Sequence, residues 1–127
     1  MTNKLVISRL GNDKYRFFAF NKPIIEGDYF NKYTTDEEKV KENLIAFELY
    51  ETINRINLVI DVSIRKYEVS VGIADGFEDD IDEWDRIISE VEALLTETVF
   101  GPSQVYAKTE RDLSKEYQRA ALDAMDE

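Results

Sequence analysis

Residues 57–73 read NLVIDVSIRKYEVSVGI, and the alternation in this stretch predicts two paired β-strands. Apolar side chains occupy every second position from Leu58 to Ile64 and then, after one change of phase, from Tyr67 to Ile73. A two-residue turn at Arg65–Lys66 would pair Ile64 with Tyr67 and Val62 with Val69, and would place all these side chains on one face. Because Arg-Lys is unfavourable turn chemistry, one longer strand with a bulge is the alternative.

A helix is predicted on either side of this stretch. Upstream, Thr35 and Glu38 match a capping box, and a helix over about 36–55 follows. Its apolar rows, at spacings of three and four, consist of Val40, Leu44 and Phe47 and of Ile45, Leu49, Ile53 and Ile56. Downstream, a helix is expected over about 80–98, ended by Gly101-Pro102. Its predicted buried face consists of Ile81, Trp84, Ile88, Val91 and Leu95.

The two ends of the chain complete the pattern. Residues 4–20 predict a hairpin, with a turn at Gly11-Asn12-Asp13 between two β-rich runs. Residues 21–33 contain Pro23 and Gly27 and indicate a loop or an irregular edge strand. A third helix is expected from Thr109, capped by Thr109 together with Asp112. Its thin apolar stripe consists of Leu113, Tyr117, Ala121 and Ala124.

These elements predict an α+β fold in a single domain over residues 1–127. A chain of 127 residues with 43% hydrophobic side chains has the length and apolar content for one hydrophobic core. We expect a small antiparallel sheet of two hairpins, about four strands, with two helices packed on one face. An additional C-terminal helix would lie in residues 103–127, which we expect to form a helical extension of the domain.

The charge is unusual and is concentrated in one part of the chain. Twenty-seven acidic against sixteen basic residues give a net charge of -11, which repels nucleic acid and anionic lipid and attracts basic partners. Residues 74–101 contain ten of the acids and a single base, Arg86. The densest part is the acidic segment, residues 75–85. Its seven carboxylates belong to Asp75, Glu78, Asp79, Asp80, Asp82, Glu83 and Asp85.

Three interpretations of the acidic segment can be compared. Acids complement the start of a helix, so a solvated acidic face with no partner is the simplest, but capping explains only two or three of them. As a helix, Glu78 to Asp85 would carry about one charge per 1.8 Å, close to the roughly 1.7 Å of duplex DNA, which favours docking to a basic protein. A calcium or magnesium site is disfavoured because the spacing of an EF-hand loop is missing.

Aromatic side chains gather near the N-terminus. Seven of the fifteen lie within residues 15–33, interleaved with Lys14, Arg16, Lys22 and Lys32. On an alternating hairpin, packing into the core explains them best, and a protein-binding aromatic patch is the second interpretation. Stacking on single-stranded nucleic acid is the third, and the net charge of the chain argues against it.

The missing residue types exclude much chemistry. The chain contains no Cys and no His, which removes thiolate catalysis, zinc ribbons and the usual hydrolase triad. Its glycines form no phosphate-binding fingerprint. We therefore expect no catalytic residues, no metal and no cofactor. The N-terminus lacks the apolar core of a signal peptide and no stretch approaches a membrane span, so a cytoplasmic protein without a membrane partner is expected.

Three classes of function remain compatible with the sequence. The first is a non-catalytic inhibitor that presents its acidic face to a nucleic-acid-handling protein, as phage anti-CRISPR and anti-restriction proteins do. That likeness is one of size, acidity and missing catalytic residues, and no motif identifies such a family. The second is an immunity protein that neutralises a toxin nuclease. The third is a non-enzymatic subunit or assembly factor of a larger complex.

Overall fold

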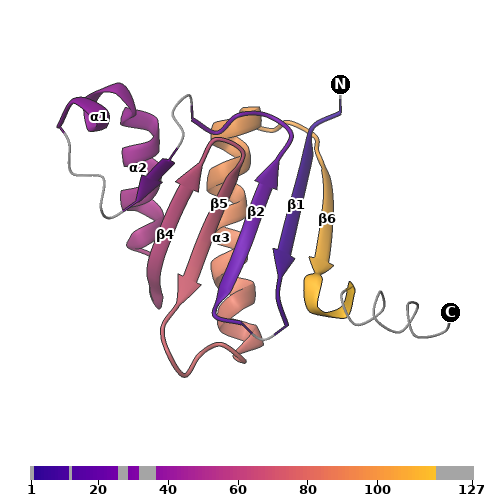
Figure 1. The fold of residues 1–127 in the computed structure, drawn as a ribbon. Helices are drawn as coiled ribbons and strands as arrows, with labels where there is room; N and C mark the ends of the chain where they lie inside the picture. The colour runs from indigo at the N-terminus through magenta and orange to yellow at the C-terminus, as the bar shows by residue number, and fades with distance from the viewer. Residues whose placement is uncertain (1, 12, 26–28, 32–36, 117–127) are drawn as a thin grey trace, which may run out of the picture.

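The structure, a computed structural model, describes residues 2–11, 13–25, 29–31 and 37–116, which form an α+β fold (Figure 1). The elements are β1 (Lys4–Arg9), β2 (Tyr15–Phe20), β3 (Tyr29–Asn31), α1 (Glu37–Glu42), α2 (Leu44–Asn54), β4 (Val59–Arg65), β5 (Glu68–Ile73), α3 (Ile81–Phe100) and β6 (Ala107–Asp112). Within these residues six strands form one sheet in the order β3-β4-β5-β2-β1-β6. The predicted class is confirmed, and the sheet is larger than the four strands expected.

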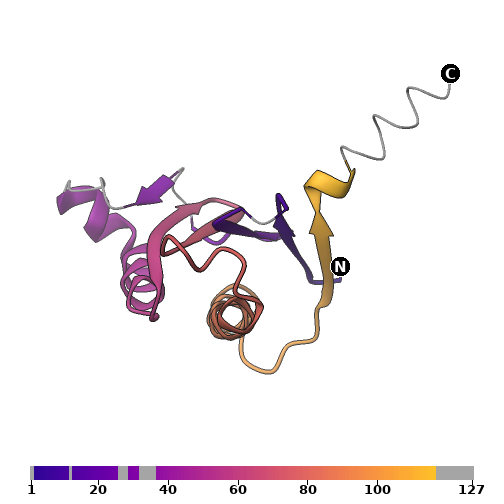
Figure 2. The same ribbon diagram turned by 90° about the horizontal axis from the view of Figure 1, so that it is seen from below.

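The sheet is mixed rather than antiparallel. β1 and β6 run parallel, whereas every other neighbouring pair is antiparallel. Figure 2 shows α2 and α3 against the same face of the sheet, while the opposite face carries no helix of the described chain. The core lies between the sheet and these helices, where Leu5, Phe18, Val69 and Ile87 are fully buried.

The central stretch forms a hairpin, and the turn lies one residue later than predicted. Ile64 pairs with Val69 and Val62 with Val71, so Lys66 and Tyr67 make the turn and Tyr67 is 49% exposed. The other alternative, one long strand, is wrong. A register shift between Val59 and Asp61 buries Val59 and leaves Ile60 exposed, which breaks the predicted row at its start.

The first predicted helix is divided into α1 and α2 at Asn43. Ala46, Leu49 and Ile53 are its buried residues, and they lie three and four positions apart on the side facing the sheet. Leu44, Ile45 and Phe47 were also expected in the buried rows but are exposed, because a helix at the edge of a sheet packs through one side only. Thr35 of the predicted capping box lies outside the described residues.

The second predicted helix, α3, is confirmed, and one residue of its face is wrong. Trp84, Val91 and Leu95 are buried and Ile88 is partly buried, as expected. Ile87, which was not predicted, is fully buried. Ile81 is 71% exposed because it occupies the first turn, at the end of α3 that extends past the strands (Figure 1). Gly101 ends the helix with a φ of 99°, which favours glycine.

The helix predicted from Thr109 begins later. Thr109 lies in β6 and pairs with Val6, because a strand at 107–112 extends the sheet along β1. Residues 113–116 are helical, and Asp112 accepts a hydrogen bond from the backbone N–H of Ser114 at 3.1 Å. Tyr117, Ala121 and Ala124 lie outside the described residues. The predicted extension of 103–127 therefore contributes a strand to the sheet.

Candidate acidic surface and adjoining groove

The acidic segment is fixed to the fold through Trp84. It comprises the loop that follows β5 and the first turn of α3, beyond one end of the sheet (Figure 1). Trp84 is 3% exposed, and its indole Nε1–H donates to the backbone carbonyl of Glu78 at 3.1 Å. Asp80 caps α3 by accepting from the backbone N–H of Glu83 at 3.1 Å. The carboxylates around this turn are therefore held on an ordered backbone.

Three of the seven carboxylates have structural roles. Besides Asp80, Glu78 accepts from the backbone N–H of Gly76 at 2.9 Å, and Glu83 forms an ion pair with Arg86 at 2.6 Å. Because residues 78–80 precede the helix, the evenly charged helix assumed from the sequence is not formed. The spacing calculated for one continuous helix therefore does not describe this surface.

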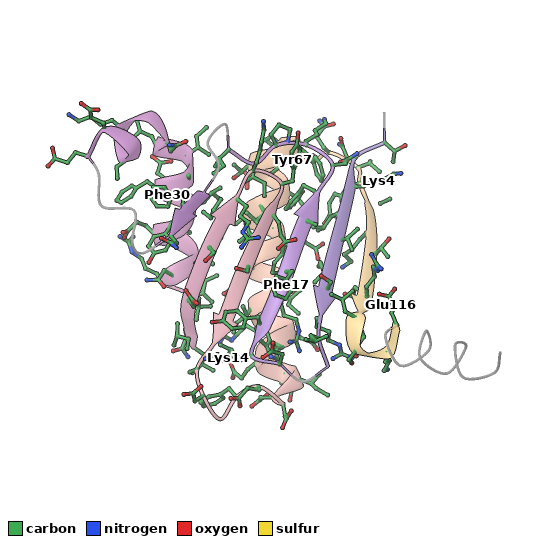
Figure 3. All side chains as sticks on the ribbon, viewed as in Figure 1. Lys4, Lys14, Phe17, Phe30, Tyr67 and Glu116 are labelled. Carbon is green, nitrogen blue, oxygen red and sulfur yellow. The ribbon has the colours of Figure 1, made fainter. Side chains whose placement is uncertain are left out.

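The other four carboxylates project into solvent. Asp79, Asp82 and Asp85 are exposed, and their side chains make no hydrogen bond or ion pair with another described residue. Asp75 lies 3.9 Å from Lys14 Nζ, but its side chain is 87% exposed and the contact contributes little (Figure 3 labels Lys14). Among the described residues, Asp79, Asp82 and Asp85 thus form a surface whose carboxylates pair with no base.

Two apolar side chains are exposed within the same segment. Phe77 is 37% and Ile81 is 71% exposed. This feature was not predicted, because the spacing of Ile81 matches that of the buried face of α3. The available signal was the position of Ile81 directly after the N-cap, where a helix has no preceding turn to pack against the core.

A groove adjoins the acidic segment. It has a volume of about 680 Å³ and lies between the N-terminal half of α3 and the strands β1 and β6; we call it the α3–β6 groove. Ile7, Trp84 and Ile88 give it an apolar lining. Figure 2 shows α3 displaced toward β5 and β2, with β1 and β6 beyond its side. Asp79 and Asp85 belong to both the acidic surface and the lining of this groove.

Arg16 is a buried cation in the lining of the groove. It is 5% exposed, its guanidinium carbon lies 4.2 Å from the centre of the Trp84 ring, and Nη1 donates to the carbonyls of Asp13 and Tyr15. Burial, reinforced by the nearby charge of Arg9, lowers the pKa of Arg16. The alternation of β2 could have revealed this, because Arg16 shares the parity of the buried Phe18 and Phe20.

Asp112 joins the end of β6 to the end of β1 and the turn that follows it, beside the groove. Its Oδ1 accepts from the Ser114 hydroxyl at 2.6 Å and from the backbone N–H of Gly11 at 3.1 Å, while Oδ2 lies 3.4 Å from Arg9 Nε. The pKa of Asp112 is lowered to about 2, most strongly by the hydrogen bond from the Ser114 hydroxyl and next by the hydrogen bond from the Gly11 N–H. Nothing in the sequence indicated the contacts of Asp112 with Gly11 and Arg9, since they join positions about one hundred residues apart.

The N-terminal aromatic residues divide between two environments. Phe18, Phe20 and Phe30 are buried, and the Phe20 ring packs edge-on against Phe100 with centroids 5.4 Å apart. The core interpretation is confirmed for these three. Phe17 is partly buried on the sheet face without a helix, as Figure 3 shows, and Tyr15 has the same strand parity. Lys32 and Tyr33 lie outside the described residues.

Three further results concern metal binding, membrane spans and related proteins. Across the described parts of the chain, no three His, Cys, Asp or Glu side chains are arranged to hold a metal ion. No helix in those parts has the length and apolar character needed to cross a membrane. Comparison of the chain with protein-family models, curated proteins and solved structures finds no match to any of them.

Proposed function

We propose that this chain is a non-catalytic protein-binding inhibitor that presents its acidic surface to a basic, nucleic-acid-binding groove of another protein, in the manner of phage anti-CRISPR and anti-restriction proteins. The observation that carries the proposal is the combination of unpaired Asp79, Asp82 and Asp85 with exposed Phe77 and Ile81 on the ordered loop after β5 and the start of α3. A solvated helix end needs neither the unpaired charge nor the apolar side chains.

The two kinds of side chain would contribute in different ways. The carboxylates would attract a basic surface over a distance and speed association at low salt. Phe77 and Ile81 would provide a desolvated contact, since apolar side chains surrounded by polar ones are typical of the centre of a protein interface. Like charges on one helix also cost a few tenths of a kcal/mol per pair in the free protein, and binding to a basic partner would offset that cost.

A matched pair of charge variants tests the proposal. In the first, Asp79, Asp82 and Asp85 are changed to Lys, which spares the helix cap Asp80 and the ion pair of Glu83. In the control, the exposed Glu37, Glu48 and Glu97 are changed to Lys, which alters the net charge equally at other places. Each protein is immobilised and exposed to a lysate of the organism that encodes the chain, and the captured proteins are identified by mass spectrometry.

We expect the wild type and the control to capture a basic nucleic-acid-handling protein that the first variant does not capture. Adding the wild type to that purified partner should displace its nucleic acid, and the first variant should not. Equal capture by both variants would contradict the proposal. Inhibition and immunity would use the same acidic surface, so only the identity of the partner distinguishes these two functions. A captured toxin nuclease would identify the chain as an immunity protein.

A further inference from the structure

The α3–β6 groove contains a buried arginine that pairs with no carboxylate of the described chain. Arg16 is 5% exposed, and no ion pair joins it to a carboxylate of the described residues. Its hydrogen bonds to described residues go from Nη1 to two backbone carbonyls. Buried charges in proteins are generally paired, because an isolated charge loses its hydration without compensation. The cation of Arg16 is therefore available to a ligand.

The free edge of the Arg16 guanidinium is accessible. Nε and Nη2 form no hydrogen bond with a described residue. In the described parts of the chain, however, every side-chain nitrogen without access to solvent has a hydrogen-bond partner. These two nitrogens must therefore reach solvent, and the groove that Arg16 lines is the adjoining space. Nε and one Nη of a guanidinium form a planar pair of donors whose spacing matches the two oxygens of a carboxylate.

A second guanidinium lies beside the first. Arg9, on the neighbouring strand β1, also lines the groove, and its Nε lies 3.4 Å from Asp112 Oδ2. The charge of Asp112 is shared, because its other oxygen already accepts from the Gly11 N–H and from the backbone and hydroxyl of Ser114. Arg9 and Arg16 are thus two neighbouring cations, and the one carboxylate that pairs with Arg9 among the described residues is already engaged, which leaves the pair short of negative charge.

The remaining lining restricts the ligand. Ile7, Trp84 and Ile88 offer an apolar surface, and the rest of the lining carries charges of both signs: the exposed carboxylates of Asp79, Asp85 and Glu110, the exposed Lys115, and Arg111, which pairs with Glu116. Because Glu116 neutralises Arg111, the three acids outnumber Lys115, and they repel a ligand with several negative charges, such as a nucleotide, more than a ligand with one. We propose that the groove binds a small organic monocarboxylate, with its carboxylate between Arg16 and Arg9 and its apolar body against Ile7, Trp84 and Ile88.

The fluorescence of Trp84 provides a direct test, because Trp84 is the only tryptophan in the chain and lines the groove. The protein is titrated at constant ionic strength with 4-methylpentanoate, with acetate, with 4-methylpentan-1-ol and with inorganic phosphate. We expect a saturable change with 4-methylpentanoate and weaker binding of the other three. Acetate lacks the apolar body, the alcohol lacks the charge, and phosphate carries additional charge at neutral pH.

Arginine variants locate the site. Arg16→Met keeps most of the buried volume, Arg9→Gln alters a side chain that is 41% exposed, and Arg55→Gln is the control, since Arg55 pairs with Glu51 on α2 away from the groove. Each of the first two should weaken binding of 4-methylpentanoate about tenfold, the effect of losing one charge-assisted contact, and the control should bind as the wild type does.

Several results would overturn the proposal. They are the absence of saturable binding of 4-methylpentanoate to the folded wild type, equal binding of the alcohol, or wild-type affinity in both Arg16→Met and Arg9→Gln. Tighter binding of phosphate would replace the carboxylate with a different class of anion. If Arg16→Met fails to fold, Arg9→Gln alone gives the answer. The titration requires no protein partner, so its result is independent of the proposed inhibitory function.

Discussion

Trp84 is the residue on which both candidate surfaces depend. Its buried ring supports the guanidinium of Arg16, and its Nε1–H fixes the carbonyl of Glu78 in the acidic segment. The same side chain therefore contributes to the core, to the lining of the α3–β6 groove and to the backbone that presents the carboxylates. Its burial was predicted from the spacing of α3, but these two contacts required the structure.

We expect Trp84→Ala to lower the free energy of unfolding by about 3–5 kcal/mol, as for other large core truncations. Trp84→Phe keeps much of the volume and loses the hydrogen bond to Glu78, so it should cost about 1–2 kcal/mol. Urea unfolding followed by circular dichroism measures both values without a tryptophan signal. Tyr67→Ala, at a side chain 49% exposed, is the control and should cost clearly less. An equal decrease in the free energy of unfolding in all three variants would contradict this structural role of Trp84.

Asp112 should make stability depend on acid pH. Its pKa is lowered to about 2, principally by the Ser114 hydroxyl, so the folded state favours the ionised carboxylate more than the unfolded state does. The contribution is complete above the ordinary Asp pKa of about 3.9 and should be lost as the pH falls toward about 2. Thermal unfolding between pH 5 and 2 should show a shallower decline for Asp112→Asn than for the wild type. Asp79→Asn is the control, because the exposed Asp79 carboxylate forms no hydrogen bond or ion pair with a described residue, and its thermal stability should decline with pH as that of the wild type does.

At the scale of elements, the periodicity of apolar side chains predicted the strands and helices that form from neighbouring parts of the sequence. The hairpin of β4 and β5 and the helix α3 were recognised because their apolar side chains repeat at two and at three to four residues. β6 was missed because its pairing joins Lys4 to Ala107, and a parallel partner so distant in sequence leaves no local pattern. Thr109 matched a helix cap, and the long-range pairing overrode that preference.

The candidate sites divide in the same way. Composition alone located the acidic segment, but the roles of its members depend on the turn at Gly76 and the cap at Asp80, so free and engaged carboxylates could not be separated. The α3–β6 groove combines residues of β1, β2, α3 and β6. Because β6 was expected to be a helix, no reading of the sequence would have placed Arg9, Arg16 and Asp112 together.

Glu92 should hold β6 against α3. Its carboxylate accepts from the Tyr106 hydroxyl and from Lys108 Nζ, the latter at 3.1 Å, and these residues lead into and lie within β6. Glu92→Ala should therefore speed amide hydrogen exchange in Ala107–Asp112 while leaving β4 and β5 nearly unchanged, since local opening needs less free energy than global unfolding. Glu97→Ala, at an exposed site on the same helix, is the control. Equal acceleration in all strands would mean that β6 opens only with the whole sheet.

At the scale of the whole molecule, the acidic surface lies apart from two further regions with apolar side chains. The acidic surface lies past one end of the sheet, whereas Phe17 is at the centre of the face without a helix (Figure 3). Leu44 and Ile45, 58% and 59% exposed, lie on α2 at the β3–β4 side of the sheet. A charge-driven contact at the acidic surface would therefore leave the open sheet face and α2 free. This arrangement is also compatible with a subunit that contacts more than one neighbour.

Salt should act on folding and on binding in opposite directions. With a net charge of -11, the folded chain repels itself, and salt screens this repulsion as the Debye length falls from about 30 Å at 0.01 M to about 10 Å at 0.1 M. The melting temperature of the free protein should therefore rise with sodium chloride over this range, as scanning calorimetry can measure.

Association with a basic partner should weaken over the same range, because screening reduces attraction between opposite charges. A partner that dissociates while the protein becomes more stable cannot be lost through unfolding, so opposite signs assign the loss to the contact itself. If binding were unaffected by salt, the contact would be apolar, and Phe77 and Ile81 rather than the carboxylates would be its main contributors.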